Sequence, residues 1–416
     1  MSGTSSVPNR GLAMRIIQAL RSGSNCLDGT GYFSAGREDL FAAAGDLLEE
    51  VEISSGAVVR WVKGPYGHGK TFFLARLMAI ARERNWVTTF VQVSARGQGR
   101  ELHRFEEIYS AIVRNCLSRD LVLAEEGKVE PGKIPGWDWI LDKWYSALRR
   151  QAAGRDSGDV PSFRLRDVIE QTMTSIRRKW NIHGSFAEAL RQFALASADS
   201  DEEWRETLLS WFRAENVHSR GPNLRAKLRT AGILEPISRK NAKEMLRSLS
   251  SFLKYRGFGG ILILIDEVEN ILQETPSARK TGYIILRELI DNLDARHGMT
   301  NSAMYLSATP DVFDAAKGIV EHPPLADRVL LPANQLNNPA PTVIDLDAHP
   351  LSDADLLEMG LRIVAVYEVA RDWKSPPEVR TGLKDLLNAR DPDLPVRMWV
   401  RDVVALLDKM SRSKAT

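Results

Sequence analysis

The stretch GPYGHGKT, which begins at Gly64, has the residue types and spacing of a loop that binds phosphate. Gly64, Gly67 and Gly69 allow the backbone torsions that turn successive N–H groups toward an anion. Lys70 adds a positive charge for the β- and γ-phosphates of a nucleotide, and Thr71 offers a hydroxyl to Mg²⁺. A glycine, four residues, then Gly-Lys-Thr is the pattern of the Walker A motif, so the sequence predicts a nucleotide site here.

The residues around this loop favour the same interpretation. An apolar stretch, VVRWV (58–62), precedes the loop and predicts a strand, and FFLARLMAIA follows it with helical spacing. The N-terminus of that helix would face the bound anion. The alternative is a glycine-rich turn with an accidental lysine. The candidate nucleotide-binding residues of the loop are Gly64, Pro65, Tyr66, Gly67, His68, Gly69, Lys70, Thr71 and Phe72.

A second candidate motif is ILILIDEVEN (261–270). Its apolar run predicts a strand buried on both faces of a parallel sheet. Asp266, at the end of that strand, would hold Mg²⁺ together with Thr71, and Glu267 would polarise the attacking water. The alternative is a buried strand that ends in acids at a surface turn. The Asp-Glu pair favours an ATPase over a GTPase, and the guanine-reading NKxD tetrapeptide is absent from the sequence.

Polar and basic residues after the next expected strand, SAMYLSATP (302–310), are candidates for sensing the γ-phosphate. Thr309 is the preferred candidate and Ser307 the second; the alternative for Thr309 is a plain turn or a helix N-cap. Arg328 is placed to act as an arginine finger on a neighbouring subunit, which implies a homo-oligomer. Its alternative is a solvated or structural ion pair.

Two further segments are candidates for contacts with the nucleotide. Arg397 opens the last expected helix and would contact phosphate, unless it is a surface arginine. The stretch YFSAGRED (32–39) contains aromatic and small residues that would flank an adenine, unless it only begins an amphipathic helix.

The order of elements predicts an α/β fold, a P-loop NTPase with a parallel sheet. Strands are expected at 58–62, 87–95 and 302–310 and in the apolar run that begins at 261 and ends in Asp266-Glu267, and residues 343–352 are expected to cross to a C-terminal bundle of three helices. The expected domains are an N-terminal segment that contacts the base (1–40), an ATPase core (41–345) with a helical insertion at about 103–254, and a helical lid (346–416).

The composition limits the class of protein. The chain has 416 residues, of which 44% are hydrophobic and 26% charged, with a net charge of +2. No apolar run reaches the roughly 18 residues of a membrane span, and no signal-peptide core begins the chain. Cys26 and Cys116 lack metal-ligand spacing and are expected to be reduced thiols in a cytoplasmic protein. The mildly basic balance permits binding to nucleic acid without arguing for it.

The expected insertion is rich in tryptophan and in basic residues. Its tryptophans at helical spacing favour a packed core over a platform for stacking bases. Its basic residues form either a solvated face or a track for a DNA backbone; they are Arg149, Arg150, Arg155, Arg164, Arg166, Arg177, Arg178 and Lys179.

Several stretches together resemble a known family: FSAGREDL, GPYGHGKTFFLARL, LRAKLRTAGILEPISRKNAKEMLRSLSSFLKYRGFGGILILIDEVEN, LSATPDVF, LADRV and PVRMWVRDVVALLD. They are similar to the BREX-system ATP-binding proteins, the BrxD-type P-loop proteins, over nearly the whole chain, and 224–270 is the most specific part. More distantly, the chain resembles AAA+ ATPases of the origin-recognition and initiator branch. That resemblance implies roles for Arg37 in the GRE element, Thr309 as a sensor, Arg328 as a finger and Arg397 as a second sensor. Family membership implies bacteriophage exclusion together with other defence proteins.

The preferred interpretation is therefore an AAA+-like ATPase that uses ATP and Mg²⁺ and works with partner proteins, on DNA, in phage defence. A nucleotide-gated scaffold with little turnover is the alternative, in which ATP binding orders the helical insertion for a partner. A P-loop kinase or other phosphotransferase is a third interpretation, disfavoured because Asp266 and Glu267 suit hydrolysis.

Overall fold

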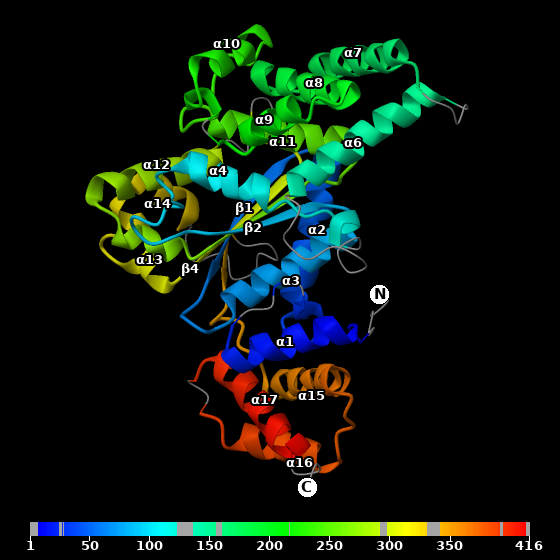
Figure 1. Cartoon of the computed structure of the whole chain (residues 1–416). Helices are drawn as coiled ribbons and strands as arrows, with labels where there is room; N and C mark the ends of the chain where they lie inside the picture. The colour runs from blue at the N-terminus through cyan, green and yellow to red at the C-terminus, as the bar shows by residue number, and fades with distance from the viewer. Residues whose placement is uncertain are drawn as a thin grey trace.

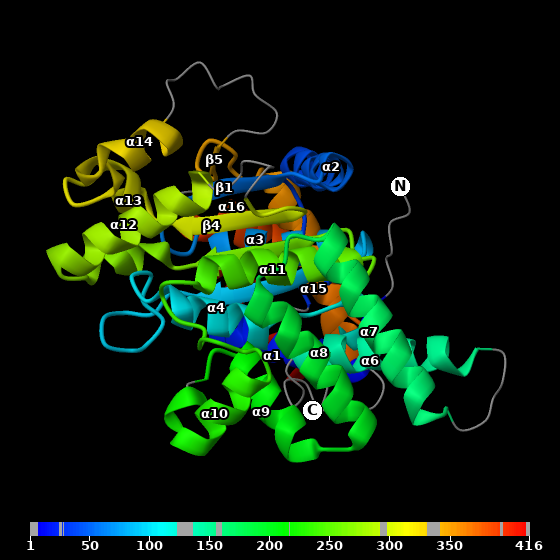
Figure 2. The ribbon, with the colours of Figure 1, turned by 90° about the horizontal axis from the view of Figure 1, so that it is seen from above.

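A parallel sheet of five strands lies at the centre of the computed structural model, which describes residues 7–24, 27, 29–122, 136–154, 160–215, 217–291, 298–330, 342–391 and 394–412 (Figures 1 and 2). The strand order is β2-β3-β4-β1-β5, and every pairing is parallel. The strands are β1 Ala57–Lys63, β2 Val87–Gln92, β3 Ile261–Asp266, β4 Ser302–Ala308 and β5 Val343–Asp345.

This strand order decides which segments meet at the carboxyl edge of the sheet. Because β4 lies between β1 and β3, its last residues stand between the glycine-rich loop after β1 and the acidic end of β3. Four strands confirm the sequence prediction. The fifth strand was not expected. Val343–Asp345 pairs with β1 at the edge of the sheet, whereas the sequence predicts only a segment that crosses to the C-terminal bundle. Three residues are too few to show a strand period in the sequence.

The two faces of the sheet are covered by different helices. Helices α2 (Glu38–Ser54) and α3 (Lys70–Glu83) pack on one face. The other face packs against α4 (Phe105–Arg114), α11 (Ala242–Tyr255) and α12 (Pro276–Asp291). Alternate residues of β3 belong to the two cores, Leu262 and Leu264 to the first and Ile261, Ile263 and Ile265 to the second. This alternation is the pleat of a strand that is buried on both sides, as its apolar run predicts.

The long region between β2 and β3 is helical, as the sequence predicts. Figure 1 shows α7 (Ser162–Lys179) to α10 (Pro222–Thr230) at the end of the molecule far from the C-terminal helices α15 (Asp353–Arg371) to α17 (Val396–Arg412). The helices are α4 Phe105–Arg114, α6 Gly136–Ala153, α7 Ser162–Lys179, α8 Gly184–Asp199, α9 Glu202–Phe212, α10 Pro222–Thr230 and α11 Ala242–Tyr255, with the 3-10 turn η2 Val217–Ser219. Their buried side chains form one hydrophobic core with one face of the sheet.

Most of the tryptophans of this region belong to that core. Trp137, Trp144 and Trp211 are fully buried. The Trp137 ring meets Phe252 edge-on with 5.5 Å between centroids, and Trp144 meets the same ring at 5.3 Å. Such edge-to-face pairs stabilise a core beyond the area that they bury. The packed-core interpretation therefore holds for these three side chains, which are out of reach of nucleic-acid bases.

The C-terminal helices form a bundle to which the N-terminal helix also belongs. α15 (Asp353–Arg371), α16 (Glu378–Asn388) and α17 (Val396–Arg412) share a core with α1 (Arg10–Ser22), which lies beside them in Figure 1. The Arg21 guanidinium donates two hydrogen bonds of 2.8 Å to the Asp408 carboxylate, which ties α1 to α17. α1 thus packs with the C-terminal helices, whereas the expected domains place it in a separate N-terminal segment that ends at residue 40.

Short helices complete the connections between the strands. α12 (Pro276–Asp291) follows β3, and the segment after β4 contains α13 and α14. The remaining short elements are η1 Thr30–Tyr32, η3 Val268–Gln273, α13 Pro310–Asp314, η4 Ile319–Glu321 and α14 Pro323–Val329. None of the described helices has the length and apolar character that crossing a membrane requires.

One of the two cysteines, Cys116, lies in the described part of the chain. Cys116 is a free thiol in the core, and burial raises its pKa to about 12, so the thiol stays protonated near neutral pH. Cys26 lies outside the described residues.

A buried ion pair inside the insertion leads to a test of stability. Arg213 and Asp138 are 8% and 7% exposed and are hydrogen-bonded to each other. Asp138→Ala removes one of the two carboxylates that hydrogen-bond Arg213, the other being Glu206, so we expect the free energy of unfolding to fall by about 2 kcal/mol, measured by urea denaturation. The matched control is Arg166→Gln, which breaks an exposed pair with Asp199 and should cost about 0–1 kcal/mol. Equal losses would show that burial of the pair is irrelevant.

Candidate functional site

The glycine-rich loop connects β1 to α3 at the carboxyl edge of the sheet. Gly67 and Gly69 have φ angles of +81° and +94°, in the left-handed region that favours glycine. A Cβ atom at Gly67 would also lie 2.7 Å from the Cβ of Pro395. Gly69 ends the loop and is followed by α3, whose first residue is Lys70. The loop therefore has the conformation that its glycines predict, with a helix N-terminus directly behind it.

The Lys70 ammonium points back into this loop. It donates hydrogen bonds to the carbonyl oxygens of Gly64 at 2.8 Å and Pro65 at 3.1 Å. Lys70 is only 7% exposed, and burial lowers the pKa of its ammonium, opposed by the charges of Glu269, Asp266 and Glu267. A positive charge with little water around it attracts an added anion, and the nearby carboxylates offset part of that attraction.

Asp266 connects three segments of the site. Its carboxylate accepts hydrogen bonds from the Thr71 hydroxyl at 2.6 Å, from the Ser307 hydroxyl and from the Glu267 backbone N–H at 3.0 Å. Asp266 is 1% exposed, so these donors take the place of water around its charge. Thr71 comes from α3, Asp266 from β3 and Ser307 from β4, and the tertiary structure brings their oxygen atoms together.

These oxygens test the expected magnesium site. Mg²⁺ prefers oxygen ligands and commonly takes only one or two from the protein, with the rest from water and phosphates. The Thr71 hydroxyl and the Asp266 carboxylate are such ligands and already touch each other. Among the described residues no group of three or more His, Cys, Asp or Glu side chains is arranged to hold a metal by itself. The donor set therefore fits Mg²⁺ bound together with a phosphate.

Glu267 has a backbone conformation that is uncommon for its residue type. Its φ angle is +58°, in the left-handed region, and its side chain lines the cavity. The Asn270 side-chain amide donates to the Glu267 carboxylate at 3.4 Å and to the Val93 carbonyl at 2.9 Å. Residues held in such conformations cluster at functional sites. Asn270 thus links Glu267 to the end of β2, a positioning contact that sequence reasoning misses.

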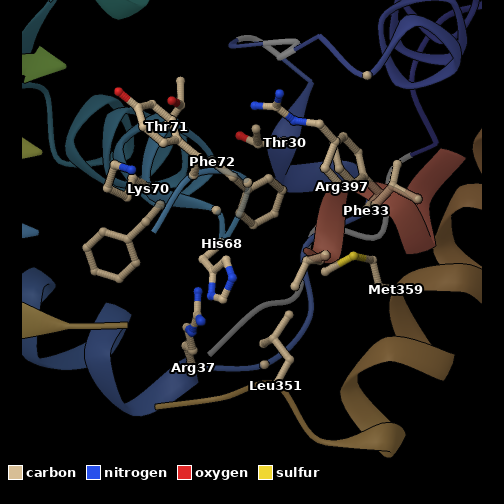
Figure 3. A pocket seen from close by; sticks show the side chains of 18 of the residues that line it. Thr30, Phe33, Arg37, His68, Lys70, Thr71, Phe72, Leu351, Met359 and Arg397 are labelled. Carbon is tan, nitrogen blue, oxygen red and sulfur yellow. The ribbon is translucent and has the colours of Figure 1, made fainter. Parts of the chain in front are cut away.

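A cavity extends from these residues toward the C-terminal bundle (Figure 3). Lys70 and Thr71 lie on one side, and Phe33, Met359 and Arg397 lie on the other. The Phe33 ring is tilted against Phe72 with 5.5 Å between centroids. Many of the residues that line the cavity are apolar; they include Leu20, Phe33, Ala35, Phe72, Leu351, Met359, Val396 and Val400. A polar end next to an apolar end is what a nucleotide requires.

Two residues join the loop region to the segment that follows β5. The Arg37 guanidinium donates to the backbone carbonyls of His349 at 2.8 Å and Leu346 at 3.1 Å, and burial lowers its pKa. The His68 ring lies 2.9 Å from the Asp347 carboxylate. Both side chains line the cavity, so their contacts connect its wall to the start of the C-terminal bundle.

The remaining predicted residues lie at different distances from the cavity. Arg397, in the first turn of α17, lines it, and its charge contributes to lowering the pKa of Lys70. Thr309 is buried at the N-cap of α13 and does not line the cavity, and Ser307 is the β4 residue that contacts Asp266. Arg328 also lies off the cavity, where it pairs with Asp291. Within one chain, Arg328 therefore forms an ion pair, which is the alternative to its role as an arginine finger.

The lining of the cavity includes a third carboxylate, that of Glu269, for which the sequence motifs predict no role. Glu269 is 5% exposed, and its Oε1 lies 4.0 Å from the Lys70 ammonium. Burial raises its pKa, opposed by the Lys70 charge. Its position two residues after Glu267 is the only sequence signal that marks it. The exposed Tyr66 ring also lies near Lys70, with 5.1 Å from the ammonium to the ring centroid, and burial together with the nearby Glu269 charge raises the pKa of its hydroxyl.

Fold and site together define an α/β protein in which the glycine-rich loop, Lys70 and three acidic side chains line one cavity. The model of the family described as BREX system ATP-binding protein BrxC/D matches residues 9–415. The match covers nearly the whole chain, so the chain belongs to this family and is an ATP-binding protein of a BREX phage-defence system. Neither the curated proteins nor the solved structures give a match to the chain.

Proposed function

We propose that this protein is an AAA+-like ATPase that hydrolyses ATP in the cavity at the carboxyl edge of the sheet. The observation that carries the proposal is the contact of Asp266 with both Thr71 and Ser307, next to Lys70 and Glu267. These contacts join the end of β3 to the loop after β1 and to the end of β4. A carboxylate, a lysine and a second acid at one edge are the groups that phosphoryl transfer to water needs.

Each end of the cavity has a proposed role in binding. The glycine-rich loop and Lys70 bind the phosphates, and Thr71 with Asp266 holds Mg²⁺. Bound Mg²⁺ neutralises charge on the phosphate oxygens. Phe33 and Phe72 form the apolar site for the base, supported by their contact at 5.5 Å. Arg397 approaches from the C-terminal bundle, which is the proposed lid.

Glu267 is the proposed activator of the attacking water. Its carboxylate lines the cavity, and the amide of Asn270 lies within 3.4 Å of it. A carboxylate held in this way orients a water molecule and accepts its proton as the oxygen attacks. Ser307 keeps Asp266 beside Thr71, so its proposed role is to position the metal ligand.

We also propose that the protein acts on DNA, through fewer basic residues of the insertion than the sequence alone suggests. Two residues of the basic cluster in the insertion are already paired with acids, Arg166 with Asp199 and Arg177 with Glu188. Paired charges release fewer counterions from a DNA backbone. Arg155 lies outside the described residues. We therefore propose that the other basic residues of the cluster contact DNA. The proposed protein partners are other BREX proteins.

Steady-state phosphate release, measured together with ATP binding, tests the ATPase proposal. We expect turnover that depends on Mg²⁺ and changes when duplex DNA is added. ATP binding without phosphate release, with and without DNA, would instead favour the scaffold, in which nucleotide orders the helical insertion for a partner. Failure of the folded protein to bind ATP would contradict both proposals.

The proposed homo-oligomer is tested through Arg328. An arginine finger acts on the site of a neighbour, where it contributes roughly 10³–10⁵ in rate. Neither Arg328→Ala nor Lys70→Ala protein should hydrolyse ATP by itself, but mixtures should regain part of the activity. In a mixed interface, the intact loop of one subunit meets the intact arginine of the other.

The ion pair of Arg328 supplies a matched control for this experiment. Asp291 is its partner within the chain, so Asp291→Ala removes the ion pair but leaves the arginine free to reach a neighbour. We expect Asp291→Ala to keep its hydrolysis. Equal losses in Arg328→Ala and Asp291→Ala, without recovery in mixtures shown to co-assemble, would assign Arg328 a structural role.

A further inference from the structure

Glu269 is a buried carboxylate with few partners, and Tyr66 and Lys70 are the side chains that lie near it. Neither of its carboxylate oxygens accepts a hydrogen bond of normal geometry within the described part of the chain. The Lys70 ammonium, 4.0 Å away, is the cation that it meets there, and both side chains are almost fully buried. A buried charge without compensation is strongly destabilising, so the Glu269 charge depends on the nearby Lys70 ammonium.

The other two acids of the site are compensated in other ways. Asp266 accepts hydrogen bonds from Thr71, Ser307 and a backbone N–H. Glu267 is half-buried and is contacted by Asn270. Glu269 is thus the acid whose charge depends on Lys70, and its charge is also the first of those that oppose the lowering of the Lys70 pKa.

Binding of phosphate changes this balance. In the structure the Lys70 ammonium is occupied by two carbonyl oxygens and faces Glu269. A phosphate that binds Lys70 has to share this charge with Glu269 and adds a second anion near the buried carboxylate. Like charges in a site of low polarity repel each other strongly. Glu269 therefore opposes the ligand that Lys70 attracts.

On the basis of the proposed nucleotide site, we propose that Glu269 is the counter-ion of Lys70 in the nucleotide-free protein and competes with the phosphates of ATP and ADP for it. This competition weakens nucleotide binding and speeds the release of ADP after hydrolysis. The residue acts on affinity through Lys70, so it is a positioning residue and not a catalytic one.

The test uses ADP that carries a fluorescent methylanthraniloyl group. The affinity of the protein for this labelled ADP is measured at equilibrium with Mg²⁺, and the rate at which the protein releases it is measured by stopped flow. Glu269→Gln keeps the shape of the side chain and removes its charge. We expect this variant to bind the labelled ADP roughly tenfold tighter than the unchanged protein and to release it correspondingly more slowly. A merely structural role predicts weaker binding, so the sign of the change decides.

Glu274→Gln is the matched control. Glu274 is also buried, follows Glu269 by one short turn and does not line the cavity; its carboxylate lies 3.8 Å from His103. This variant should bind ADP as the unchanged protein does. Glu269→Asp withdraws the carboxylate by one methylene and should give a smaller gain in affinity, which keeps the test available if the glutamine variant does not fold.

The outcomes separate this inference from the proposed function. If the unchanged protein binds labelled ADP but folded Glu269→Gln or Glu269→Asp binds it equally or more weakly, the counter-ion role is wrong and the nucleotide site stands. If the folded, unchanged protein does not bind ADP or ATP at all, the proposed nucleotide site fails, and the counter-ion role fails with it.

Discussion

Lys70→Ala is expected to lower the affinity for ATP by about 100-fold, because it removes the charged donor of the phosphate site. Lys70 is buried at the end of the glycine-rich loop, and its ammonium is held within reach of that loop by the carbonyls of Gly64 and Pro65. Water cannot replace the charge inside a site that excludes it. Isothermal calorimetry with ATP and Mg²⁺ measures the effect directly.

Lys63→Ala is the control for this substitution. Lys63 ends β1, just before the loop, and its ammonium lies 3.5 Å from both Asp314 and Asp345. It does not line the cavity, so its loss should leave ATP affinity within a few-fold of the unchanged protein. Equal affinities of the Lys70→Ala and unchanged proteins would contradict the assignment of the loop.

Glu267→Gln is expected to keep ATP bound while it slows hydrolysis by about 10²–10⁴. The substitution preserves the size of the side chain and its place beside Asn270 but removes its ability to accept a proton from water. Thr71, Asp266 and Lys70 remain, so the binding of phosphate and metal is retained. A single-turnover measurement of phosphate release, with ATP affinity measured on the same protein, separates chemistry from binding.

Glu274→Gln again supplies the control, because it neutralises a nearby acid that does not line the cavity. Its rate of hydrolysis should equal that of the unchanged protein. Comparison with Glu269→Gln adds a second distinction. Glu267→Gln should lower the rate of the chemical step, whereas Glu269→Gln should act first on affinity and on ADP release. If turnover in Glu267→Gln were unchanged, another group would have to activate the water.

The amino-acid sequence by itself determines the local parts of the site and of the fold. The glycines of the loop require left-handed torsions, which Gly67 and Gly69 have in the structure. The apolar run before Asp266 predicts a strand buried on both faces, and β3 is one. The three helices expected in the C-terminal bundle correspond to α15, α16 and α17. These features depend on torsions and on periodicity within a few turns of chain, so neighbouring residues suffice to predict them.

Only the tertiary structure decides which distant side chains meet. Ser307, rather than the preferred Thr309, contacts Asp266, because β4 lies between β1 and β3 and presents Ser307 there. Glu269 faces Lys70 because a turn after β3 brings it under the loop after β1.

The N-terminal helix and the shortest strand show the same limit. α1 packs with α15 and α17 although most of the chain separates them, and β5 is a strand only because it pairs with β1. Arg37 extends to the carbonyls of Leu346 and His349, which no local pattern predicts. Such contacts depend on how the whole chain packs, since their free energy comes from burial and pairing between segments that are far apart in the sequence.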